Sequence, residues 1–501
     1  MTRRRAATRA VSVAFAACVA LASAPASASP LFELAGSQRG GFSGRATEAG
    51  AASTYFNPAF LPDADEGLEL GVFALSDQIG VHLQGRGDPS VNLAEGTENA
   101  QRPGGGRYPT YGVPTDWLEN GKPAEAPDEP LKPRPRQGAG SGQNVRLYQM
   151  LGLVTKFFKG RVGLGLYAMI PYSEFTGAAA FFSDEREQYF SNSLHPELYA
   201  DRLTATSLAF GTGVKVRDDL SVGVSFTLSL KTTASTPTYL VDVGRTKDIL
   251  VDTKVSVQAS VAPHFGAVYK PKPWLTLSGT LHTPQKFEIG TNFSFLLASG
   301  LEQGAELKFT HAYLPWTGAL GADLEVWRRD KDAVRIVTTL ALAGWSAYVD
   351  RHGEKPSGAF AWYDTLSGTV GGRYQHKGSR VLLDATFQPS PVPTQSGRTS
   401  YVDSARAGLA AGFDQRFEVF GAELRAGFQL QAHRLLPRST QKLTPNGDPA
   451  LVRDEVPDDA VLDTLPDAAK RGLQTNNPGW PGFSSEGWLL GAGLNVALVT
   501  K

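Results

Sequence analysis

The feature that most constrains this chain is a series of strand-like segments joined alternately by short and by long connections. In 220–230, for example, Leu, Val and Phe occupy the even positions and Ser, Gly and Thr the odd ones. A period of two places the apolar residues on one face of a β-strand. Many segments run to ten residues or more, longer than the five or six that are usual in soluble folds. The pattern therefore indicates long antiparallel strands with one apolar face.

We predict fourteen strands, and they alternate between the two kinds of connection. The strands are expected at 67–83, 145–158, 161–182, 204–216, 219–231, 254–270, 273–292, 306–328, 333–349, 367–377, 380–389, 404–413, 418–433 and 486–499. The short links are 159–160, 217–218, 270–272, 329–332, 377–379 and 414–417. The long links are 84–144, 183–203, 232–253, 293–305, 350–366, 390–403 and 434–485.

This sorting of connections is typical of outer-membrane barrels, which have short periplasmic turns and long extracellular loops. A soluble sheet also shows the alternation of residues, but it has no reason to sort its loops by length. A closed barrel pairs every backbone polar group within the membrane. The predicted fold class is all-β, a transmembrane antiparallel β-barrel of about 14 strands in a Gram-negative outer membrane.

The N-terminus predicts export. Residues 1–28 combine a basic head, a short apolar run and an Ala-Ser-Ala exit, which together are typical of a secretory signal peptide. The only cysteine, Cys18, lies in this run, and the residues before it make a poor lipidation motif. We therefore expect a mature chain without cysteine, and no metal or cofactor. The formal net charge of +0 gives no support for a nucleic-acid partner.

The histidines give little support for catalysis. The eight are scattered and form no HExxH or other close ligand pair, and no GxSxG or phosphate-binding motif occurs. One loop cluster, His195 with Asp184 and Ser191, leaves open a hydrolase built from surface loops. We predict that the chain is not an enzyme.

Residues 29–66 precede the first strand and cannot be part of the barrel wall, which we assign to 67–501 with long extracellular loops at 84–144 and 434–485. A barrel of fourteen strands is too wide to be filled by its own side chains. We therefore expect this small, apolar segment to lie inside the lumen as a hatch. The best candidates for a hydrophobic ligand pocket are its phenylalanines, Phe32, Phe42, Phe56 and Phe60.

The hatch residues also carry a resemblance. FELAGSQRGGFSGRATEAGAASTYFNPAFLP resembles the N-terminal hatch of FadL-type outer-membrane transporters of long-chain fatty acids and other hydrophobic compounds. Further segments resemble that family in order, among them LHTPQKFEIG, YLPWTGALGADLEV, AGWSAYVD, PSPVPTQSGRTSYVDSARAGLAAGF and RAGFQLQAHRLLPRS. The resemblance covers most of the chain apart from the two long loops, and it implies a fourteen-stranded barrel with a hatch.

The resemblance also implies a mechanism. In that family an Asn-Pro-Ala turn of the hatch packs on an inward kink of the third strand, and a ligand captured against the hatch leaves sideways into the membrane. The residues that would correspond are Asn57, Pro58 and Ala59 in the hatch and Gly163, Gly165 and Pro171 in the third strand, 161–177. Without the resemblance, Asn-Pro is an ordinary turn starter.

Four charged residues are expected to face the lumen: Arg373, Arg406, Glu423 and Arg425. They could form a ladder of structural ion pairs across neighbouring strands, which we favour, or they could contact a ligand. The expected partners are a long-chain fatty acid or other apolar small molecule, outer-membrane lipid and the barrel-assembly machinery, although the last residue, Lys501, is not aromatic. We expect a monomer. The alternative functions are a non-specific channel and a surface-binding barrel.

Overall fold

The structure is a computed structural model, and it describes the hatch, the barrel wall and parts of the loops. The described residues are 30–84, 139–140, 144–172, 195–196, 198–199, 203, 206–240, 249–251, 254–297, 302–350, 355–356, 358–395, 400–442 and 482–500. The predicted signal peptide, Cys18, Asp184 and Ser191 lie outside them. No helix among them is long and apolar enough to span a bilayer.

Fourteen of the described strands form a closed antiparallel barrel, as predicted. They are β1 (Gly67–Leu83), β3 (Asn144–Phe157), β4 (Val162–Pro171), β6 (Ser207–Arg217), β7 (Leu220–Leu240), β9 (Lys254–Lys272), β10 (Leu275–His282), β13 (Thr317–Arg329), β14 (Asp332–Ala343), β15 (Thr365–His376), β16 (Ser379–Gln388), β18 (Arg406–Val419), β19 (Ala422–Gln441) and β20 (Gly482–Val499). Each pairs with the next, and β1 pairs with β20 from Gly67↔Val499 to Leu83↔Phe483, which closes the ring.

The outer face of the wall is apolar. Leu320, Leu383, Leu409 and Leu494 are each 60–72% exposed, although they lie on strands that are paired on both sides. Polar side chains such as Asp77 and Asn495 point inward and are buried. This arrangement is the reverse of a soluble protein and suits a wall surrounded by lipid.

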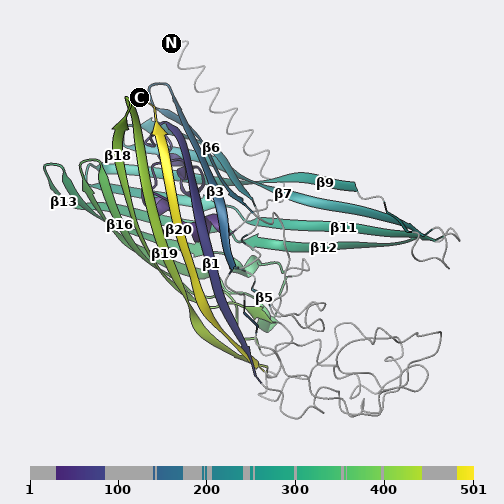
Figure 1. Ribbon diagram of the computed structural model, residues 1–501. Coiled ribbons are helices and arrows are strands. Elements are labelled where there is room, and N and C mark those ends of the chain that lie inside the picture. Colours follow the sequence, from purple (N-terminus) through teal and green to yellow (C-terminus); the bar gives the residue numbers. More distant parts are fainter. Residues whose placement is uncertain are drawn as a thin grey trace.

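Two predicted strands are each divided in the structure. Segment 273–292 becomes β10 and β11 (Gln285–Leu297), and segment 306–328 becomes β12 (Glu302–Leu314) and β13. The divisions fall at Pro284 and Pro315, where proline has no N–H to donate to a ladder. β11 pairs with β12 and runs parallel to the outer half of β7, next to the short β8 (Ile249–Val251). Figure 1 shows β7, β9, β11 and β12 extending beyond the barrel.

Several predicted strand boundaries are wrong because the strands extend further than the prediction gave them. The predicted turn at 414–417 is strand, because β18 continues to Val419 and the turn is Phe420-Gly421. Both turn residues have positive φ, 49° and 79°, as the common hairpin turn requires. The link predicted at 270–272 lies instead at 273–274, and β19 and β20 extend into the predicted loop 434–485. The alternation of apolar and polar residues continues beyond the membrane-spanning part of these strands, so it does not mark where the barrel wall ends.

Residues 30–66, called the hatch below, lie inside the barrel (Figure 1). They form three short helices, α2 (Leu31–Ala35), α3 (Gly44–Thr47) and α4 (Ser53–Phe56), and a 3-10 turn, η1 (Pro58–Phe60). Leu31, Ala59 and Leu61 have no exposed surface, although the hatch is too small to bury them by itself. A small parallel pair outside the wall, β5 (His195–Pro196) and β17 (Tyr401–Val402), joins two extracellular loops.

Candidate functional site

The Asn-Pro-Ala turn begins η1 and is fixed by the side chain of Asn57. Its Oδ1 accepts from the Ala59 N–H at 3.2 Å, which is an N-cap, and its Nδ2 donates to the Arg45 carbonyl at 3.1 Å. Pro58 stands at the first position of the turn, where its missing N–H costs nothing. Residues 57–59 therefore form a rigid turn that packs against the barrel wall.

Three glycines, one on each of three adjacent strands, form the surface under this turn. They are Gly213 on β6, Gly223 on β7 and Gly266 on β9, and we call them the glycine seat. A Cβ atom on Gly213 would lie 2.2 Å from the Pro58 oxygen, and one on Gly266 would lie 2.1 Å from the Asn57 Oδ1. The hatch can approach the wall this closely only because these positions have no side chain.

The sequence prediction placed Asn57, Pro58 and Ala59 against the third strand, and the structure places them elsewhere. The turn contacts β6, β7 and β9, whereas the third strand, β4, contacts other hatch residues. Gly163 faces Leu61 and Pro62, and Gly165 faces Thr54 and Leu61. The hatch lies across several strands of a curved wall, so neighbouring hatch residues contact different strands.

Among the described residues, the pairing of the third strand changes only at its outer end, and no inward kink is described. Gly163 and Gly165 are paired with both neighbours, β3 and β6, so no opening lies beside them. Pairing of β4 with β6 ends at Met169↔Ser207, whereas pairing with β3 continues to Pro171. Proline has no N–H for a second ladder, which explains why the pairing with β6 ends just before it.

The hatch phenylalanines pack within the hatch and against the barrel wall, and none of them lines the cavity described below. Phe32 lies 4.6 Å from the Tyr55 ring and 5.1 Å from Tyr167 of the wall. Phe56 packs edge-on against Tyr55, and Phe60 contacts Val268. Phe42 lies 4.8 Å from the ring of His433. These phenylalanines therefore contribute to packing of the hatch. Their position gives no support to the prediction that they form a ligand pocket.

The predicted lumen charges mostly form ion pairs. Arg373 binds Asp384 of the next strand, and its Nη2 also donates to the Gly40 carbonyl of the hatch at 2.8 Å. Glu423 accepts from Arg416 at 2.9 Å, and Arg425 binds Asp65 of the hatch. These contacts agree with the interpretation as structural pairs, with the addition that two of them hold the hatch.

The periplasmic end of the hatch is held by its own carboxylates. Asp63 binds Lys215 of β6 at 2.5 Å and Lys270 of β9 at 2.6 Å. Asp65 binds Arg416 and Arg425, on β18 and β19. Burial opposes ionisation of Asp63, but the two lysines lower its pKa below the usual value. We call Asp63 and Asp65 the hatch base, which is tied to four strands.

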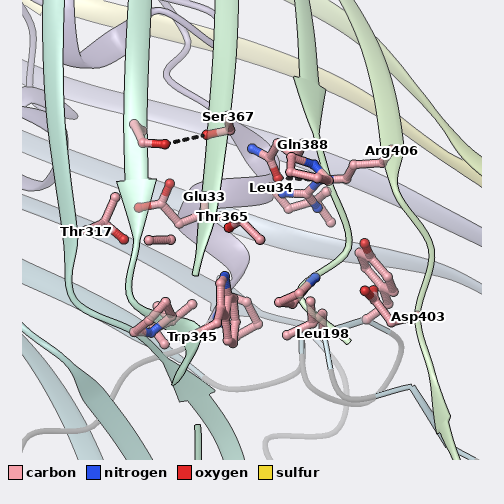
Figure 2. A pocket seen from close by; sticks show the side chains of 18 of the residues that line it. Glu33, Leu34, Leu198, Thr317, Trp345, Thr365, Ser367, Gln388, Asp403 and Arg406 are labelled. Atoms are coloured by element: carbon pink, nitrogen blue, oxygen red, sulfur yellow. Dashed lines mark hydrogen bonds between the residues drawn. The ribbon is translucent and has the colours of Figure 1, made fainter. Parts of the chain in front are cut away.

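A cavity of about 110 Å³ lies between α2 and the extracellular loops (Figure 2). Its hatch side is formed by Pro30, Glu33, Leu34 and Arg45. Its wall side includes the polar residues Thr317, Thr365, Ser367, Gln388 and Arg406. Its outer side consists of Leu198, Tyr199, Trp345, Pro389, Pro391 and Asp403. The lining therefore combines charged and polar groups with apolar ones.

On the hatch side of the cavity, Glu33 and Arg45 form an ion pair with each other. Arg45 donates to both oxygens of Glu33, at 3.1 and 2.5 Å, and the Tyr55 hydroxyl donates to Glu33 at 2.6 Å. Burial alone would raise the pKa of Glu33, but Arg45 and Tyr55 together lower it. The pair approaches two wall histidines, His264 and His282, whose rings pack at a tilt of 51° with their centroids 4.2 Å apart.

The fourth predicted lumen charge, Arg406, differs from the others. Its Nε donates to Gln388 at 2.6 Å, and its guanidinium carbon lies 5.7 Å from the centre of the Tyr199 ring. Among the described residues, no carboxylate lies within ion-pair distance of it, although Asp403 lines the same cavity. Arg406 is thus a cationic group that faces the cavity without a salt bridge to the part of the chain that is described.

Aromatic side chains form the roof above the cavity. Tyr348 and Trp362 stack at 3.5 Å with their planes 6° apart, and Trp345 and Tyr401 pack around them. Trp345 belongs to both this cluster and the cavity. Sequence reasoning missed the roof, although AGWSAYVD and the Pro-rich segment at 389–393 are visible signals of ordered loops.

The described residues contain no group of three His, Cys, Asp or Glu side chains suited to a metal ion. His195 pairs with Tyr401 through the backbone, and its predicted partners Asp184 and Ser191 lie outside the described residues. The structure therefore gives the hydrolase alternative no site to describe.

The fold is shared with a solved FadL homologue of Pseudomonas aeruginosa, at 13% identity, 95% coverage of this chain, 98% of the other and a TM-score of 0.52. A toluene transporter of P. putida, TodX, also aligns, at 11% identity over 95% of this chain and 99% of the other, with a TM-score of 0.47. No protein-family model and no curated protein sequence matches the chain. The first comparison establishes a fold shared with the FadL homologue.

Proposed function

We propose that this protein transports hydrophobic small molecules across the outer membrane. The observation that carries the proposal is the cavity between the hatch and the aromatic roof. A plugged lumen with a cavity on the extracellular side suits capture of a ligand better than free diffusion of solutes. The fold shared with the FadL homologue agrees with this proposal, because the sequence resemblance to FadL-type transporters implies the same class of ligand.

We further propose that the ligand is amphipathic, as a long-chain fatty acid is. Arg406 and its polar neighbours offer hydrogen bonds to a carboxylate, and Leu198, Tyr199 and Trp345 offer apolar contact to a chain. The present cavity is smaller than the roughly 300–1,000 Å³ of most small-molecule sites. It therefore suits one end of a ligand, and a longer chain requires the roof or α2 to shift.

For the exit we propose a sideways path into the membrane near Ile170 and Pro171. The pairing of β4 with β6 has ended there, so separating the strands costs fewer hydrogen bonds than it does elsewhere on β4. The hatch base argues against loss of the whole plug, because it is tied to four strands. An apolar molecule also gains more from entering lipid than from entering periplasmic water.

The first test is binding of a matched pair of ligands, a long-chain acid and the primary alcohol of the same length, to the purified full chain. Arg406→Met should weaken binding of the acid by about tenfold or more and leave the alcohol nearly unchanged, because a lost charge-assisted bond is worth roughly 1.5–3 kcal/mol. Arg434→Met, on the outside of β19, is the control. If neither the acid nor the alcohol bound, that result would contradict transport and favour the channel or the surface-binding barrel.

Conductance separates those alternatives. A non-specific channel should conduct ions in planar bilayers whether or not residues 29–60 are present. The proposed transporter should conduct little with its hatch and much more without it, since the hatch fills the lumen. A surface-binding barrel should bind its partner through the long loops and lose that binding when 86–140 is deleted.

A further inference from the structure

One wall of the cavity is made by a proline-rich segment, Pro389–Gln395, which we call the proline hook. Proline occurs at alternate positions, 389, 391 and 393, and Pro389 and Pro391 line the cavity. Proline fixes φ and has no N–H, so such a segment is stiff and cannot join a sheet as a regular strand. Its carbonyl groups must find donors elsewhere.

Arg438, on β19, supplies several of those donors at once. Its Nη2 donates to the Val392 carbonyl at 2.6 Å and the Pro393 carbonyl at 2.7 Å, and its Nη1 donates to the Ser390 hydroxyl oxygen at 2.7 Å. No other donor to these two carbonyls is found among the described residues. A planar guanidinium suits this task, because its N–H groups are held in one fixed fork.

The position of Arg438 results from an irregularity in the strand. The register between β19 and β20 shifts between Leu435 and Arg438, a stretch that includes Pro437. Such a bulge redirects the side chain that follows it. Arg434, four residues earlier, instead binds Glu486 and lies over the Trp488 ring at 5.2 Å. The same strand thus directs one arginine to the hook and another away from it.

Other contacts make the hook part of the roof. Val392 is buried among the aromatic residues, and the Pro391 carbonyl accepts from the Tyr363 N–H at 2.8 Å. The Ser390 hydroxyl donates to Asp403 at 2.5 Å. Gln395 exchanges two hydrogen bonds of 2.6 Å with the backbone of Tyr401. The hook is therefore held along its length, and among the described residues Arg438 is the one side chain that spans its middle.

We propose that Arg438 is a positioning residue that keeps the proline hook as a rigid wall of the cavity and thereby sets which ligand shapes are selected. The proposal rests on the proposed function, since it concerns the selectivity of the same cavity. A preformed wall discriminates by shape, because binding of a ligand that does not fit requires free energy to deform the wall. A mobile wall adapts to many shapes.

The test compares Arg438→Met and Arg438→Lys with Arg434→Met as the matched control. Affinities of the full-length protein are measured for a linear and a methyl-branched acid of equal carbon number. Arg438→Met should reduce the preference between them by about tenfold, Arg438→Lys should restore part of it through its single nitrogen, and Arg434→Met should change nothing. Equal preference in Arg438→Met and the unaltered protein would overturn the role in selectivity.

A second measurement does not depend on any ligand. Hydrogen exchange of the amides at 390–395 and 400–405 reports whether the hook is held. Arg438→Met should speed this exchange at least about tenfold, the effect of roughly 1.4 kcal/mol, and Arg434→Met should not. Unchanged exchange in Arg438→Met would show that Arg438 does not hold the proline hook. If no ligand binds even the unaltered protein, the proposed function fails while this measurement still decides the role of Arg438.

Discussion

The glycine seat makes a quantitative prediction about how the hatch is held. In Gly223→Ala the new Cβ would lie 2.4 Å from the Pro58 carbonyl carbon and 2.5 Å from the Ala59 nitrogen. Both are backbone atoms, so no side-chain rotation can relieve the contact. Ordinary contact begins at 3.4 Å, so the turn must retreat by about 1 Å. Overpacking of this kind costs about 1–3 kcal/mol, which corresponds to a roughly 5- to 150-fold larger population of the displaced hatch.

The assay labels a buried thiol in the hatch. The chain has one cysteine, Cys18, in the predicted signal peptide, so Ser53→Cys, at a position with no exposed surface, introduces a single hatch thiol. A water-soluble maleimide reacts only when the hatch leaves its seat, and its rate follows the open population if reclosing is fast. Gly372→Ala is the control, because a Cβ there meets nothing within 4 Å. Equal labelling in the two alanine variants would refute the reasoning, provided that both barrels remain folded.

Three further predictions concern the base, the roof and the turn. Asp65→Asn leaves Arg425, which is 2% exposed, without its hatch carboxylate and should destabilise the seated hatch by on the order of 3 kcal/mol, raising thiol labelling, whereas Asp218→Asn in an exposed pair should not. Burial raises the pKa of Asp403 to about 6 from 3.8, so protection of the amides at 390–395 and 400–405 against exchange should be greatest below pH 4, fall up to about pH 6 and be flat above it, and Asp403→Asn should remove this change. Protection that grows with pH would contradict that assignment. Asn57→Ala and Pro58→Ala should loosen the turn on the glycine seat and lower uptake of a hydrophobic tracer by a folded barrel, and unchanged uptake in both would show that the seated turn is not needed for transport.

The barrel itself could be predicted because a wall between lipid and lumen forces a period of two on every strand. The same signal failed at the strand ends, because β7, β9, β11 and β12 keep it outside the membrane. The breaks at Pro284 and Pro315 could have been found, since proline interrupts a ladder wherever it stands.

The site was less predictable for a geometric reason. Gly213, Gly223 and Gly266 form a surface only when three strands are aligned, and their spacing in sequence says nothing about that register. The aromatic hatch residues suggested a greasy pocket, yet Phe32 and Phe56 pack against other rings within the plug and the wall. The cavity instead takes residues from α2 and several loops, which only the folded barrel brings together.

The two ends of the hatch are held by different chemistry, and this difference indicates which end can move. The base is tied to the wall by ion pairs of Asp63 and Asp65, whereas α2 is held mainly by neutral hydrogen bonds from Gln429 and Gln431 to its last carbonyls, at 3.3 and 2.8 Å. The Glu33 carboxylate is neutralised chiefly by Arg45 of the hatch itself.

A ligand in the cavity therefore meets the hatch at its weakly held end. Moving α2 breaks bonds worth roughly 1 kcal/mol each, and moving the base exposes charges whose separation costs several times more. Exchange of the amides at 31–36 should consequently change when a ligand binds, while that of the amides at 63–66 should stay constant. A ligand that loosened the base and left α2 protected would show that the plug is released toward the periplasm, and the sideways exit would then have to be abandoned.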